Sequence, residues 1–120
     1  MPQLNSQSED QLFMVFVEIV DFHKFDELVE KHMAWLTRKF EEGIFVVTGG
    51  LFEDEGQKSN RALAILQAPS IQAVHELMSD DPFVVNSVCQ YTFRRYEPRM
   101  HTEALSRLLP LKNSASVAPR

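Results

Sequence analysis

The sequence predicts an α+β fold, a ferredoxin-like domain whose antiparallel four-stranded sheet is built from elements in the order strand, helix, strand, strand, helix, strand. Three observations predict it. Four segments are rich in β-branched and aromatic residues, and two others repeat apolar residues at the helical spacing of three and four. Their order along the chain is the split βαβ pattern. The length of 120 residues suits a single domain.

The first predicted strand, Leu12 to Val20, reads LFMVFVEIV and is apolar on both alternating faces except at Glu18. A strand with two apolar faces is expected to be buried on both sides. The polar segment before it, residues 1–11, shows no such pattern, and we expect it to be disordered.

The stretch from Phe25 to Gly50 reads as a helix, a glycine stop, a strand and a glycine pair. The apolar residues of the helix form one stripe: Phe25, Leu28, Val29, Leu36 and Phe40. His32 falls on the same stripe and is expected to point towards the core, whereas Trp35 is expected on the opposite side. Gly43 suits the left-handed position that follows a helix.

The second strand, Ile44 to Thr48, is predicted to end at Gly49 and Gly50. An acidic hairpin loop over Leu51 to Asn60 then leads to the third strand, Arg61 to Gln67, which is again apolar on both faces. A glycine pair at a strand end makes a bulge or a turn, or lets a ligand approach the backbone, and the sequence leaves these alternatives open.

Ser70 is predicted to cap the second helix, which must end before Pro82 because the residue preceding a proline is pushed out of helical geometry. Asp81 is therefore fixed at a bend. A turn from Phe83 to Ser87 leads to the fourth strand, about Val88 to Tyr96.

Beyond Pro98 the pattern predicts a short amphipathic helix, from about Thr102 to Leu109, and then a tail rich in serine, alanine and proline. The predicted organisation is thus a disordered segment over residues 1–11, a ferredoxin-like domain over residues 12–98, and a C-terminal helix and tail over residues 99–120.

The composition argues against several classes of protein. The net charge of −5 does not suit a nucleic-acid surface. The longest apolar run, Leu12 to Val17, is far shorter than the ~20 residues that span a bilayer, so no membrane partner is expected. The N-terminus lacks the basic and apolar regions of a secretion signal, and a lone Cys89 cannot form an internal disulfide. We expect a cytoplasmic protein in which Cys89 is a small buried residue.

The chain offers no pattern for a metal or nucleotide site. Its four histidines show no closely spaced pair of ligands: His23, His32, His75 and His101. The glycine pair at Gly49 lacks the further spacing and the lysine of a phosphate-binding loop. We therefore expect neither a metal nor a cofactor.

Four strands that are apolar on both faces, with only two main helices to cover one of them, leave a sheet face too apolar for a soluble monomer. A homodimer that places the two sheets face to face and closes a barrel is the economical solution. Whether such dimers associate further is left open by the sequence.

The segment KHMAWLTRKFEEGIFVVTGG, followed by MSDDPFVVNSV, resembles the YCII-related (YciI-like) family. The resemblance rests on His32 four residues before Leu36, on two glycines and on Asp81, Pro82 and Phe83, and it covers roughly residues 13–98. It implies a dimeric α+β barrel of ferredoxin-like subunits. It also implies that His32 and Asp81 face each other in a cleft and form an active site for acid–base chemistry.

A carboxylate that accepts a hydrogen bond from one imidazole nitrogen fixes the ring, so that the other nitrogen can take a proton near neutral pH. The pair therefore favours proton transfer on a small acidic or aromatic molecule, as in isomerase- or lyase-type steps. Further candidates for binding this ligand are Gly49, Gly50, Phe83 and Arg94, where the arginine would hold an anionic group.

Two alternatives stay open at this point. His32 and Asp81 can instead be a buried hydrogen-bonded pair that holds a binding or structural homodimer together. The same barrel also serves haem-degrading and cofactor-free monooxygenases, but a shared fold says little about function, and the chain has no haem-ligand motif. An open pocket at the histidine ring favours chemistry, and a sealed pair favours a structural role.

Overall fold

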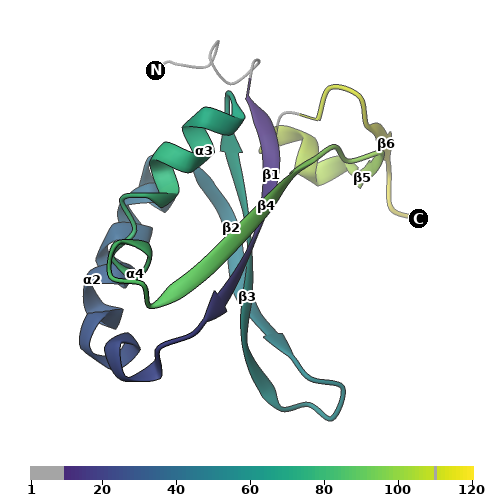
Figure 1. Cartoon of the computed structure of the whole chain (residues 1–120). Helices are drawn as coiled ribbons and strands as arrows, with labels where there is room; N and C mark the ends of the chain where they lie inside the picture. The colour runs from purple at the N-terminus through teal and green to yellow at the C-terminus, as the bar shows by residue number, and fades with distance from the viewer. Residues whose placement is uncertain (1–9, 110) are drawn as a thin grey trace.

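The computed structural model of the chain describes residues 10–109 and 111–120 (Figure 1). The disordered segment predicted over residues 1–11 falls outside this range except for Asp10 and Gln11, and Gln11 begins the first strand.

Four antiparallel strands form the main sheet in the order β2-β3-β1-β4. Their bounds are Gln11–Ile19 for β1, Phe45–Phe52 for β2, Lys58–Ala68 for β3 and Cys89–Tyr96 for β4. The first strand lies in the centre, where Val15 is opposite Ala64 of β3 and Phe93 of β4. This is the predicted ferredoxin-like arrangement, and the prediction is confirmed.

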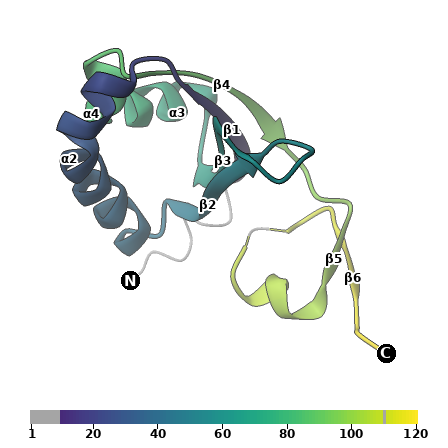
Figure 2. The ribbon, with the colours of Figure 1, turned by 90° about the horizontal axis from the view of Figure 1, so that it is seen from below.

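Three helices, α2 (Phe22–Glu41), α3 (Ile71–Met78) and α4 (Pro82–Val85), all lie on one face of the sheet (Figures 1 and 2). The Asp21 side chain caps α2 by accepting a 3.0 Å hydrogen bond from the backbone N–H of Lys24. Ser70 caps α3 in the same way, as predicted.

The glycine pair does not end the second strand as predicted. The strand β2 continues through Gly49 and Gly50 to Phe52, and β3 begins at Lys58, so the connecting loop is much shorter than the one predicted over residues 51–60. The pairing register shifts on either side of the glycines, between Phe45 and Val47 and between Gly50 and Phe52. With these bulges the backbone around Gly49 and Gly50 stays paired with β3. The hydrogen bonds of that pairing outweigh the low strand propensity of glycine.

The predicted turn from Phe83 to Ser87 is instead mostly the one-turn helix α4. Its start has a clear local cause, because Asp81 is the N-cap residue and Pro82 follows at the first helical position. A proline is tolerated there, since the backbone N–H that it lacks would have no partner within the helix. The prediction treated Pro82 only as the residue that stops the preceding helix, and overlooked that it also begins the next one.

The C-terminal segment also differs from its prediction. In place of an amphipathic helix over Thr102–Leu109, a short strand β5 (Met100–Thr102) and a 3₁₀ helix η1 (Glu103–Arg107) follow each other. A parallel pairing with β6 (Ala115–Val117) holds β5 extended, and the few residues that remain are too short for a stable α-helix.

The core lies between the helices and the facing side of the sheet. Its buried residues come from strands β1 to β3 and from helices α2 and α3: Phe13, Val15, Trp35, Leu36, Phe45, Ala64, Leu66, Ala68, Val74 and Met78. Trp35 is only 4% exposed, so its predicted position on the outer side of the helix is wrong. It is three residues from His32, and one helical turn places residues that far apart on neighbouring parts of one face.

The other face of the sheet carries no α-helix of the described residues (Figure 2). It combines apolar residues of β1, β2 and β3 with polar residues of β4 such as Thr92 and Arg94. Phe16 lies opposite Leu63, and Met14 lies opposite Ile65, on the side that alternates with the buried Phe13 and Val15. Phe16 is 40% exposed and Val47, on the same face of β2, is 51% exposed. We call this surface the open sheet face. It is the uncovered surface that the sequence pattern predicts.

Gly43 ends α2 with φ +79°, a conformation that strains residues with a Cβ atom. We expect Gly43→Ala to lower the free energy of unfolding by about 1 kcal/mol. Glu41→Ala, at an exposed position in the last turn of the same helix, is the control and should change it by less than about 0.5 kcal/mol. Urea unfolding followed by circular dichroism measures both, and equal stability of the two variants would contradict the role given to Gly43.

Burial in a small apolar cluster, assisted by the negative charge of Asp81, raises the pKa of the Cys89 thiol to about 12. In the unfolded chain the pKa of this thiol is about 9, so between about pH 9 and 12 the native state keeps a thiol proton that the unfolded state has lost. The contribution of Cys89 to the free energy of unfolding therefore falls as the pH rises through this range. We expect iodoacetamide at pH 8 to leave native Cys89 unmodified and to alkylate it in urea, as measured by mass spectrometry. Rapid labelling of the folded protein would show that the thiol is accessible after all.

Candidate functional site

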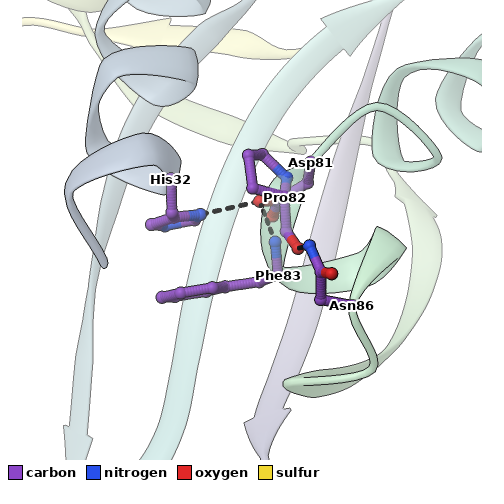
Figure 3. Close-up of polar contacts among 5 residues, drawn as sticks. All are labelled: His32, Asp81, Pro82, Phe83 and Asn86. Atoms are coloured by element: carbon purple, nitrogen blue, oxygen red, sulfur yellow. Dashed lines mark hydrogen bonds and ion pairs between the residues drawn. The ribbon is translucent and has the colours of Figure 1, made fainter. Parts of the chain in front are cut away.

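The structure brings His32 and Asp81 together across 49 residues of sequence (Figure 3). His32 projects from the middle of α2, and its Nδ1 atom lies 2.8 Å from Oδ1 of Asp81. The two side chains are 18% and 4% exposed, respectively. A carboxylate has no proton to donate, so the Nδ1–H of the imidazole is the donor and Nε2 is left as the reactive nitrogen.

Local structure explains why the Asp81 carboxylate is fixed. Its backbone N–H bonds the carbonyl oxygen of Met78 at the end of α3, and its Oδ1 accepts a 3.0 Å hydrogen bond from the backbone N–H of Phe83 at the start of α4. Asp81 is the only buried charged residue in the described part of the chain. The same oxygen atom of Asp81 thus accepts the hydrogen bond that caps α4 and the hydrogen bond from His32.

Phe83 covers one face of the histidine ring. The two rings are stacked, with centroids 4.0 Å apart and planes inclined by 5° (Figure 3). Phe83 is itself buried and leans against Phe25 of α2. With Nδ1 bound to Asp81 and one face against Phe83, the imidazole is held in one orientation. Its Nε2 atom makes no hydrogen bond to any described residue.

A cavity of about 570 Å³ lies between α2 and the sheet, and both His32 and Asp81 line it. That volume suits a small organic molecule. Three of the strand positions that border it carry small side chains: Gly50, Ala62 and Ala64. Larger residues there would fill the space beneath α2, so these small residues keep the cavity open. The histidine pair is therefore exposed to a pocket and is not sealed in the core.

Trp35 also lines the cavity, and the sequence analysis did not identify it as a site residue. Its ring centroid lies 6.1 Å from that of His32, and Phe45 of β2 meets it edge to face. Its Nε1 donor is buried and has no hydrogen-bond partner among the described residues. The signal that could have found it is its spacing of three residues from His32 on the same helix.

The other candidate residues separate into two groups. Gly50 and Phe83 line the cavity, whereas Gly49 borders a shallow depression with Val47 and Leu63 on the open sheet face. Arg94 is exposed and lies opposite Met14, on the open sheet face, where its guanidinium donates to the carbonyl of the preceding residue. The structure thus does not bring Arg94 or Gly49 to the histidine pair.

Lys58 is a second cavity residue that the sequence analysis missed, because it was assigned to a loop. It begins β3, and its stem passes over Gly50, with Cε 3.8 Å from where a Cβ atom on that glycine would stand. Lys58 forms no ion pair with another described residue. Its ammonium group is thus available to an anionic ligand at the cavity wall.

Among the described residues, no group of three or more histidine, cysteine, aspartate or glutamate side chains is arranged to hold a metal ion. No helix in residues 10–109 and 111–120 has the length and apolar character needed to cross a membrane.

Among solved structures, the chain is similar to 5-chloro-2-hydroxyhydroquinone dehydrochlorinase (TftG) from Burkholderia phenoliruptrix AC1100, in complex with 2,5-dihydroxybenzoquinone. The TM-score is 0.59 at 17% identity, and the match covers 71% of this chain and 92% of that one. This likeness shows the fold alone. A variant of SnoaB, a cofactor-independent oxygenase from Streptomyces nogalater, matches more weakly, with a TM-score of 0.40 at 14% identity over 73% of this chain and 91% of the other.

No curated protein matches the chain. The family model of the YCII-related domain, however, matches residues 4–97, which include both His32 and Asp81 and most of the described fold. That match extends over more than three quarters of the sequence, and the chain therefore belongs to the YCII-related family.

Proposed function

We propose that this protein is a small enzyme that moves protons within a small acidic or aromatic organic molecule, with His32 and Asp81 as its acid–base pair. One observation carries the proposal. The imidazole lies in the wall of a cavity of about 570 Å³, with Nδ1 bound to a buried carboxylate and Nε2 free of hydrogen bonds to the described residues. A histidine held in this way is oriented for general acid–base catalysis.

In the proposed step, Nε2 of His32 takes a proton from an acidic O–H or C–H group of the bound molecule. The negative charge of Asp81 lies against the resulting imidazolium and stabilises it through the Nδ1–H hydrogen bond. The protonated ring then returns its proton to another atom of the same molecule, or to a leaving group. Isomerisation and elimination both follow this scheme, and neither requires a cofactor.

The similar structure TftG supports this class of chemistry, because a dehydrochlorinase removes a proton together with chloride. The low identity does not carry its substrate over to this chain. Its bound 2,5-dihydroxybenzoquinone nevertheless provides a suitable probe, since the compound is small, acidic and planar.

We further propose that two copies of the chain associate through the open sheet face. Phe16 and Val47 expose much of their apolar surface there, and the helices on the opposite side cannot cover them. Burying such a face against its symmetry mate removes apolar area from water on both subunits. The cavity lies on the helix side of the sheet, so each subunit would retain its own site.

For the reaction, we expect the wild-type protein to accelerate exchange of the ring hydrogens of 2,5-dihydroxybenzoquinone for deuterium in D₂O, as followed by ¹H NMR. His32→Gln should lower the rate by a factor of about 100 or more, since it removes the base. Asp81→Asn should lower it less and leave the fold intact, because an amide oxygen can still cap α4.

His75→Gln is the matched control, since His75 is exposed on α3 and does not line the cavity. It should exchange the probe at the wild-type rate. If the wild type accelerates no exchange, and if Asp81→Asn and His32→Gln lower only the free energy of unfolding, the pair is a structural one and the enzyme proposal fails.

For the assembly, we expect Phe16→Lys to convert the dimer to a monomer in sedimentation-velocity experiments, because it places a charge at the centre of the open sheet face. Ile71→Glu is the control, since Ile71 is 59% exposed but lies on α3 on the helix side. It should sediment like the wild type. A wild-type monomer, or a Phe16→Lys variant that stays dimeric, contradicts this interface.

A further inference from the structure

The C-terminal arm, residues 99–109 and 111–120, takes no part in the core or in the cavity. The YCII-related family match ends at residue 97, so the family relationship does not cover it. Its elements β5, η1 and β6 pack against one another, and none of them packs extensively on a described helix or strand of the main domain. The arm leaves the end of β4 on the side of the sheet that faces away from the helices (Figures 1 and 2).

A segment of this size needs a surface on which to fold. Units of fewer than about 40 residues usually require disulfides, metals or association, and a two-stranded sheet is marginal by itself. The contact of the arm with its own domain is small, and its polar part is a 2.8 Å hydrogen bond from the side-chain amide of Asn113 to the carboxylate of Glu97. Four apolar side chains of the arm are instead 39–70% exposed: Met100, Leu105, Leu108 and Val117. The arm therefore has apolar surface that its own domain does not cover.

The arm and the main domain carry opposite charges. By sequence, residues 99–120 hold four basic residues and one acidic residue, whereas residues 1–98 hold 8 basic and 16 acidic residues. Glu53, Asp54 and Glu55 follow one another at the tip of the β2–β3 hairpin, and all three are exposed. None of the three forms an ion pair with another described residue. This hairpin tip is an acidic surface that complements a basic segment.

Within one copy of the chain, the hairpin tip and the arm lie at opposite ends of the sheet (Figure 1). The strand β4 ends where β1 begins, since Tyr96 is opposite Leu12. The hairpin extends β3 beyond the other end of β1, where Arg61 is opposite Glu18. The arm of one copy is thus far from the hairpin tip of the same copy.

We propose that the arm of each subunit docks on a second copy of this chain, with its basic side chains against the acidic hairpin tip of the partner. This inference rests on the proposed dimer through the open sheet face, because the arm projects from the sheet on that side (Figure 2). A twofold axis that lies between the two sheets and runs across the strands places each end of one sheet next to the opposite end of the other. The arm then meets the hairpin tip of its partner.

The charges favour this arrangement over the other simple face-to-face pairing. An axis that runs along the strands places arm next to arm, and both arms are basic. Like charges in contact weaken an interface, and the acidic hairpin tips would remain without a partner. In the arrangement that we propose, the exposed side chains of Met100 and Leu108 also add apolar area to the interface of the two sheets.

The first test measures proximity in full-length chains. Asp54→Cys and Arg107→Cys are separate variants at exposed positions, and the native Cys89 is buried. After the two variants are mixed and exchange subunits, a short bismaleimide should link them into a heterodimer that mass spectrometry identifies. Arg107→Cys by itself should give no linked dimer. A linked dimer of Arg107→Cys by itself shows that arm lies next to arm and overturns the inference.

The second test exchanges the charges. Glu53→Lys/Glu55→Lys makes the hairpin tip basic, and Arg107→Glu/Lys112→Glu makes the arm acidic. Each double variant should raise the dissociation constant of its homodimer about tenfold at low salt, because both contacts become repulsive. An equimolar mixture of the two should dimerise like the wild type, since each reversed arm then meets a reversed hairpin. Sedimentation velocity over a range of concentrations measures these constants.

The matched control is Glu30→Lys/Glu41→Lys, which changes the net charge by the same amount at two exposed positions of α2 on the helix side. Its dissociation constant should lie within twofold of the wild-type value. Circular dichroism checks that each variant folds. If the control weakens the dimer as much as the hairpin variant does, the effect comes from net charge and the inference fails.

The outcomes separate this inference from the dimer itself. If Phe16→Lys dissociates a wild-type dimer, but the mixed cysteine variants do not link and the charge variants dimerise like the wild type, the sheet interface is supported and the role of the arm is overturned. If both charge variants are weakened and their mixture is not restored, the arm does not meet the hairpin tip, and the inference fails. If the wild type is a monomer, both proposals fail together.

Discussion

The rest of the site depends on one oxygen atom, Oδ1 of Asp81. It accepts a hydrogen bond from the backbone N–H of Phe83 and another from the imidazole of His32, so one buried carboxylate both starts α4 and orients a side chain on α2. The same cap also sets the position of Phe83, because it brings the phenyl ring flat against the imidazole of His32. A change at Asp81 therefore acts on the helix cap, the ring stack and the imidazole at once.

The cavity exists because of a contrast in side-chain size between the two layers. On α2 the residues that face the sheet are large, among them Trp35 and Leu36, whereas the sheet beneath offers small residues such as Gly50 and Ala62. The resulting space of about 570 Å³ opens to solvent and is large enough for a small organic molecule. Gly50 lies within β2 and does not end the strand, and its lack of a side chain contributes to this space on the cavity side.

The hydrophobic pattern correctly predicted the fold, and the family resemblance correctly implied that His32 and Asp81 lie together. Neither predicted all the residues that line the cavity. Four apolar strands and two periodic helices leave little choice of topology, and the histidine lies on the buried stripe of its helix. Trp35 was missed because the prediction assigned only one narrow stripe of α2 to the core. The buried face of the helix is wide enough to include Trp35 as well. Lys58 was missed because a polar, glycine-containing segment reads as a loop until its pairing with β2 is known.

The sequence by itself therefore determined the class of fold and the apolar sheet face, since hydrophobic periodicity is a local signal. The pairing of His32 with Asp81 was implied by the resemblance to the YCII-related family, because no local pattern joins two residues 49 positions apart. Only the tertiary structure decided which residues share the cavity. It placed Gly50 and Lys58 in the wall of the cavity that His32 also lines, and turned Arg94 and Gly49 to the other face. It left the Trp35 donor without a partner among the described residues. The reason is physical: strand register and the alternation of side chains assign each residue to a face, and a bulge of one residue reverses that assignment.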